Sequence, residues 1–211
     1  MEGALDAAQR LALRVESRRW VIAVGCAIAF LAVMGILRFA HKEQLRLFNL
    51  DGERNVPAAF SALLWLGVAL LALLVGRASQ GRPELAWKLL AALTLVLAAD
   101  ELAEVHEHLQ FYAGIDWQIL YAPLGVTALV LWVVLGRWLR QVGAGLVPFV
   151  GAAGCVAVAE VFEALEINSR GDPRPGFRVM VVSEEVLEMT AALLIGLSAL
   201  AALRAVTSRP A

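Results

Sequence analysis

Three clusters of acidic residues each lie at one end of a long apolar segment of the sequence. The stretch AEVHEHL at residues 103–109 returns as AEVFEAL at residues 159–165, with five of the seven letters and both glutamates in common. Carboxylates from several helices, joined by an imidazole, make an oxygen-rich set of metal ligands. The candidate metal ligands are Asp100, Glu101, Glu104, Glu107, His108, Glu160, Glu163, Glu184 and Glu188.

Helical spacing places most of these side chains on shared faces. Successive residues of an α-helix are rotated by about 100° around its axis. On that spacing Glu160 and Glu163 share one face, and Glu184 and Glu188 share another. His106 points away from its neighbours and is the less favoured ligand. The first cluster falls within one arc, with Glu101 at its edge, and contains Asp100, Glu104, Glu107 and His108.

Many carboxylates in one cavity need positive charge, which protons, Arg or Lys partners, or a metal ion can supply. We favour metal, with Fe, Mn or Zn preferred because of the imidazole, and Mg or Ca compatible with the oxygen ligands. Glutamates three residues apart on facing helices are also typical of di-iron helical bundles. Those bundles use Glu-x-x-His on two helices, whereas only His108 is well placed here. A two-metal centre therefore stays open.

Three functions fit such a cluster. A metal-dependent membrane enzyme, either a di-metal oxidoreductase or a hydrolase, is the favoured one. A divalent-cation or proton-coupled transporter is the alternative, although the remaining lengths of these segments offer few polar groups for a path. A structural subunit of a membrane assembly is the second alternative. In that case the acids would pair with basic residues on the same side of the membrane, namely Arg38, Lys42, Arg46, Arg170 and Arg178.

The segments that carry these residues are long and apolar. The chain has 211 residues, of which 60% are hydrophobic, and a mean hydropathy of +0.72. Because one membrane crossing needs roughly 20 apolar residues, the sequence predicts an all-α, polytopic membrane helical bundle. It comprises an amphipathic segment at 1–19, a single transmembrane domain at 20–204 and a tail at 205–211. The six predicted transmembrane helices are 20–40, 57–76, 85–108, 117–136, 144–167 and 179–203.

The third and fifth predicted helices run in one direction and the sixth in the other, so their acidic ends meet on one side of the membrane. Eleven Lys and Arg residues fall on the opposite side and seven on this one. This asymmetry predicts cytoplasmic N- and C-termini in a bacterial inner membrane, with the acids near the outer leaflet. Its many small residues make 144–167 the expected centre of the bundle. Glu166 is interpreted as an ordinary interfacial residue.

Two short patterns resemble those of a known group of proteins. Asp100-Glu101 followed by His106-Glu107 forms a D-E-x4-H-E segment, and residues 184–189 form E-E-x-x-E-M. Together they resemble multi-span bacterial membrane proteins of unassigned function. The resemblance implies a multi-span fold and draws attention to His106, but it implies no known activity. Expected partners are membrane lipid and metal ion, with a homo-oligomer or a membrane complex left open. The net charge of -1 gives no reason to expect nucleic acid.

Overall fold

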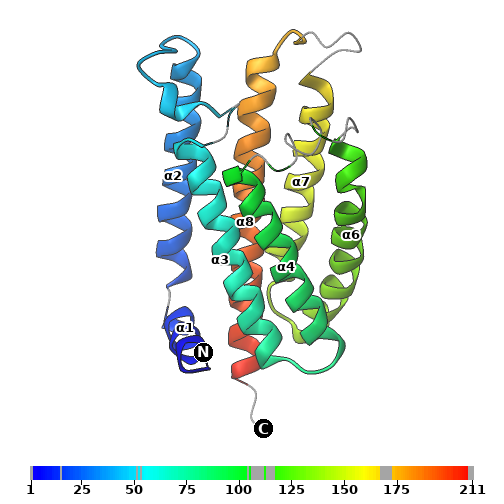
Figure 1. Cartoon of the computed structure of the whole chain (residues 1–211). Helices are drawn as coiled ribbons and strands as arrows, with labels where there is room; N and C mark the ends of the chain where they lie inside the picture. Colours follow the sequence, from blue (N-terminus) through cyan, green and yellow to red (C-terminus); the bar gives the residue numbers. More distant parts are fainter. Residues whose placement is uncertain are drawn as a thin grey trace.

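The computed structural model is an all-α bundle, as the sequence predicts (Figure 1). It describes residues 2–14, 16–50, 52, 54–103, 105, 112, 117–166 and 173–208. Within these residues there are seven α-helices and one short 3₁₀ turn, η1, at Arg46–Phe48. The helices are α1 (Glu2–Arg14), α2 (Ser17–Arg38), α3 (Val56–Ala78), α4 (Arg82–Ala103), α6 (Trp117–Val142), α7 (Leu146–Glu166) and α8 (Phe177–Thr207).

Five of these helices are long and apolar enough to cross a membrane, so the chain is a multi-span membrane protein. α4 corresponds to the third of the six predicted crossings, but it is not among the five. It carries charged residues near both ends, from Glu84 and Lys88 to Asp100 and Glu101. The five candidate spans are Ser17–Arg38, Val56–Ala78, Tyr121–Val142, Leu146–Glu166 and Phe177–Thr207.

Local sequence explains where two of these helices begin. The Asn55 side chain accepts a hydrogen bond from the backbone N–H of Ala58 at 3.0 Å and so caps the start of α3. α7 begins just after Gly145, which has a φ of +78°. A Cβ atom at this position would lie 2.6 Å from the backbone oxygen of Ser198 in α8. Glycine therefore lets the start of α7 approach α8 closely.

The centre of the bundle is α8, not the segment 144–167 that we expected from its small residues. The side chains of Met189, Ala192 and Leu203 in α8 are fully buried. By contrast, Val147 and Val150 of α7 are well exposed and face outward. Small residues allow helices to approach closely. In α7 many of them lie instead on the outer surface, where no other part of the described chain covers them.

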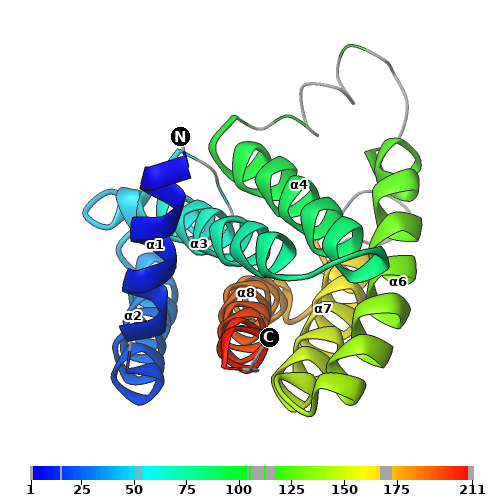
Figure 2. The same ribbon diagram turned by 90° about the horizontal axis from the view of Figure 1, so that it is seen from below.

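The ribbon shows α4 and α7 running in one direction and α8 in the other, so the acidic ends of all three lie toward the same end of the bundle (Figure 1). α1 lies across the opposite end and does not continue the line of α2 (Figures 1 and 2). Asp6 of α1 forms an ion pair with Arg77 at the end of α3, at 3.6 Å. Arg204 of α8 donates a hydrogen bond to Ser17 of α2 at 2.7 Å. These contacts hold the opposite end together.

Candidate functional site

The end of α7 and the beginning of α8 bring four glutamates together. The side chain of Glu166 lies against that of Glu184, and Glu163 and Glu188 lie near enough to act electrostatically on Glu184. All four side chains are half-buried. The backbone N–H of Arg174 donates to the carbonyl oxygen of Glu166 at 2.9 Å and fixes the chain beside the end of α7. We call Glu163, Glu166, Glu184 and Glu188 the α7–α8 carboxyl cluster.

The cluster follows from helical spacing on two antiparallel neighbours. Residues three or four apart lie on one face of a helix, which aligns Glu163 with Glu166 and Glu184 with Glu188. Carboxylates a few ångströms apart repel one another, so the four carboxyls gathered between α7 and α8 make the cluster a place where positive charge is favoured.

The carboxylates of α4 make a different kind of contact. Asp100 accepts a hydrogen bond from the Tyr121 hydroxyl of α6 at 3.0 Å. Glu101 accepts one from Ser61 of α3 at 2.7 Å, and Ser61 is 1% exposed. Each of these bonds joins α4 to a neighbouring helix through a neutral hydroxyl. Among the described residues, the carboxyls that act on Glu184 come from α7 and α8 and not from α4.

Of the remaining predicted ligands, the structure describes only Glu160, which lies outside the cluster. Glu160 is exposed, although it lies one helical turn before the half-buried Glu163. Glu104, His106, Glu107 and His108 lie outside the residues that the structure describes, so a role for them as ligands stays a prediction.

The described side chains do not form a metal-binding site. Among them, no group of three or more His, Cys, Asp and Glu side chains is arranged to hold a metal ion. Metal binding is therefore not supported by the arrangement of the described side chains, and any metal centre is a proposal.

The cluster includes one residue that the sequence interpretation missed. Glu166 was expected to be an ordinary interfacial side chain, yet it lies against Glu184. The available signal was its spacing, because Glu160, Glu163 and Glu166 recur every three residues. The rotation of α7 toward α8 decides that Glu166 and Glu163 face the cluster while Glu160 does not.

The interior of the bundle beyond the cluster is mostly apolar. Phe149 and Ala152 of α7 and Met189 of α8 are fully buried. The hydroxyls of Thr94 and Thr190 donate to carbonyls of their own helices, at 3.0 Å and 2.7 Å. In the described part of the chain, the polar cluster is thus confined to one end of the bundle.

The family of the chain follows from the residues that a family model matches. A family model, described as a domain of unknown function, DUF8692, matches residues 19–203. The chain belongs to the DUF8692 family. The DUF8692 match covers every one of the described helices from α2 onward, apart from the last turn of α8. No curated protein and no solved structure matches the chain.

Proposed function

We propose that this membrane protein binds a divalent metal ion at the α7–α8 carboxyl cluster and uses it as a metal-dependent enzyme. The observation that supports the proposal is the gathering of Glu163, Glu166, Glu184 and Glu188 between α7 and α8. A metal ion can balance the charge of these carboxyls, which coordinate in their deprotonated form. Two or more carboxylates on a divalent cation are the ligands that Mg, Mn and Fe prefer.

The proposal needs a modest rearrangement. The carboxyl side chains would turn from each other toward a common centre, and water or a ligand from another part of the chain would complete the coordination. His108 is the strongest such candidate in the sequence, since imidazole favours Fe, Mn or Zn. Such a centre could activate a water molecule for hydrolysis or support redox chemistry.

A fixed site is favoured over a transport path. A transporter needs polar groups along a route through the membrane. Here the described interior beyond the cluster is lined by fully buried apolar side chains such as Phe149 and Met189. The hydroxyls of Thr94 and Thr190 are already engaged by their own helices. A cluster open toward one end suits chemistry at that face of the membrane.

We further propose that α4 is the sixth crossing and that both termini are cytoplasmic. With 22 residues, α4 is about 33 Å long, which matches the hydrocarbon thickness of roughly 30 Å. Its Lys88 is neutralised by Glu84 at 2.6 Å, which lowers the cost of placing both near the membrane boundary. The excess of basic residues at the other end of the bundle favours that end as the cytoplasmic one, in a bacterial inner membrane.

Metal analysis of the purified full chain tests the proposed function. We expect near-stoichiometric divalent metal in the wild-type protein and background metal in a Glu184→Gln, Glu188→Gln variant. Glu160→Gln is the control, because it makes the same kind of substitution once, at an exposed position on α7. We expect it to keep its metal. Background metal in the wild type would remove the proposal, and equal loss in the control would show that the cluster is not the site.

A further inference from the structure

The end of the bundle opposite the carboxyl cluster carries many basic side chains. It is formed by α1, by the starts of α2 and α4, and by the ends of α3, α6 and α8 (Figures 1 and 2). Ten basic residues belong to these segments, against the four acidic residues Glu2, Asp6, Glu16 and Glu84, for a formal charge of +6. The ten are Arg10, Arg14, Arg18, Arg19, Arg77, Arg82, Lys88, Arg137, Arg140 and Arg204. We call this surface the basic end.

Only some of these basic side chains form ion pairs within the protein. Arg19 pairs with Glu16 at 2.8 Å, Arg77 with Asp6 at 3.6 Å and Lys88 with Glu84 at 2.6 Å. Six other arginines are exposed and form no ion pair with any other residue that the structure describes. They are Arg10, Arg14, Arg18, Arg82, Arg137 and Arg140. Exposed arginines in this number favour an anionic partner.

The position of α1 indicates that the partner lies in the plane of the membrane. α1 lies across the end of the bundle and does not continue the line of α2 (Figures 1 and 2). Ala12 is buried against the bundle, whereas Leu11 is 69% exposed and lies between Arg10 and Arg14. An exposed leucine beside two arginines is typical of a helix at the boundary between lipid headgroups and acyl chains.

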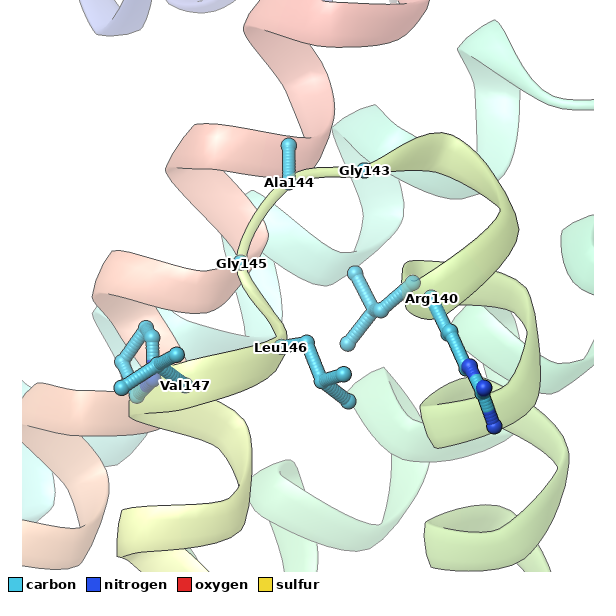
Figure 3. Close-up of a pocket in the computed structure, with 8 residues that line it drawn as sticks. Arg140, Gly143, Ala144, Gly145, Leu146 and Val147 are labelled. Carbon is cyan, nitrogen blue, oxygen red and sulfur yellow. The ribbon is translucent and has the colours of Figure 1, made fainter.

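A hollow at the α6–α7 turn is also lined by both a basic side chain and apolar side chains. It has a volume of about 270 Å³ and is lined by Leu139, Arg140 and residues 143–148. Figure 3 shows Arg140 on α6 and Val147 at the start of α7, with the turn through Gly143, Ala144 and Gly145 between them. Val147 is 83% exposed. The hollow thus combines the guanidinium of Arg140 with apolar side chains, a pairing that matches a phospholipid, which joins an anionic phosphate to an acyl chain.

We propose that the basic end binds anionic phospholipid headgroups, one of them in the hollow beside Arg140. The membrane setting selects lipid over nucleic acid or an acidic peptide, because basic residues of this end lie at the ends of the candidate spans α2, α3, α6 and α8 and within the interfacial α1. Anionic lipid attracts basic residues next to a membrane surface, and this attraction falls off within a Debye length. The inference does not depend on the metal proposal, since it concerns the opposite end of the bundle.

Lipid retention by the full chain tests this inference. Native mass spectrometry in detergent would compare the binding of phosphatidylglycerol with that of phosphatidylcholine. We expect tighter binding of the anionic lipid, and a loss of about fivefold in its affinity for each arginine removed in an Arg137→Gln, Arg140→Gln variant. A Lys42→Gln, Arg46→Gln variant is the matched control, because it removes two exposed positive charges from the other end. We expect it to keep the preference.

Two results would overturn the inference. One is equal binding of the two lipids by the wild type, and the other is the same loss in both variants. A salt titration of the wild-type protein guards against a variant that fails to fold. We expect the preference for anionic lipid to shrink as salt rises, because screening weakens contacts between exposed charges. A preference that does not change with salt would also count against headgroup binding.

Discussion

The acidic residues of α4 and those of α7 and α8 lie toward the same end of the bundle but differ in their partners. Asp100 and Glu101 each accept a hydrogen bond from a neutral hydroxyl, on Tyr121 and Ser61. Glu166 and Glu184 lie against each other, with two more carboxyls nearby. A hydroxyl satisfies a carboxylate without any change in charge. Two carboxyls satisfy each other only with a proton or a cation between them.

This difference separates two uses of the same residue type. The α4 carboxylates act as tethers that hold α4 against α3 and α6. In the α7–α8 cluster, the gathered carboxyls favour positive charge at a fixed place between two helices. The account therefore assigns stability to the contacts of α4 and ligand binding to the cluster. Substitutions in the two regions should separate these effects.

The largest effect is expected at Glu184. Glu184→Gln removes a charged metal ligand, so we expect metal affinity to fall by more than roughly 100-fold, beyond the loss typical of outer partners. The metal-free protein should unfold at the same or a higher temperature, because a repulsive charge is gone. Metal titration and thermal unfolding measure the two effects. An unchanged metal affinity would place the site elsewhere.

A pH series should sharpen the contrast. Since carboxyl ligands must be deprotonated to coordinate a metal ion, acid competes with metal and the affinity should rise with pH. One displaced proton corresponds to a change of about tenfold per pH unit, as 1.36 kcal/mol corresponds to one pKa unit. Calorimetric titration in buffers of different ionisation enthalpy counts the protons released. The slope should disappear in Glu184→Gln, and a slope that persists there would assign the protons to other groups.

The tether between α3 and α4 should affect stability rather than binding. Ser61→Ala removes a buried donor from Glu101, and a hydrogen bond to a charged group contributes about 1.5–3 kcal/mol. We expect a loss of stability of this size with metal content unchanged. Glu101→Gln retains an acceptor oxygen for Ser61 and should cost less. Loss of metal in Ser61→Ala at normal stability would mean that the two regions are one site.

The tether between α4 and α6 should give the smallest effect. Tyr121→Phe removes the hydroxyl that donates to Asp100, and we expect a cost of about 0.5–1.5 kcal/mol. The effect is smaller than at Ser61 because Tyr121 and Asp100 are only half-buried and water can replace the hydroxyl. Thermal unfolding of the purified variants measures the difference. A larger loss than in Ser61→Ala would contradict this ranking.

The sequence was sufficient to predict the helices and their directions. Runs of apolar residues predicted helices at 57–76 and 179–203, and the structure has them at Val56–Ala78 and Phe177–Thr207. The shared end of the acidic clusters follows from counting antiparallel crossings. Hydropathy could not establish all six crossings, because the charges of α4 lie within its length.

The composition of the cluster could not be predicted from the sequence. A helical wheel gives the angle between Glu160 and Glu163 but not which of them faces α8. Only packing between helices fixes that rotation, and it leaves Glu160 exposed while turning Glu163 and Glu166 inward. The contacts from Asp100 to Tyr121 and from Glu101 to Ser61 join residues distant in sequence, so no local sequence pattern predicts them.

The most direct test of the account is an anomalous scattering map of crystals of the full chain grown with Mn²⁺. The account predicts a peak between α7 and α8, within a coordination distance of roughly 2.0–2.6 Å from oxygens of Glu166 and Glu184. A map with no peak at that place, or with its only peak on Asp100 and Glu101 of α4, would contradict the central claim that the paired carboxyls hold a metal ion.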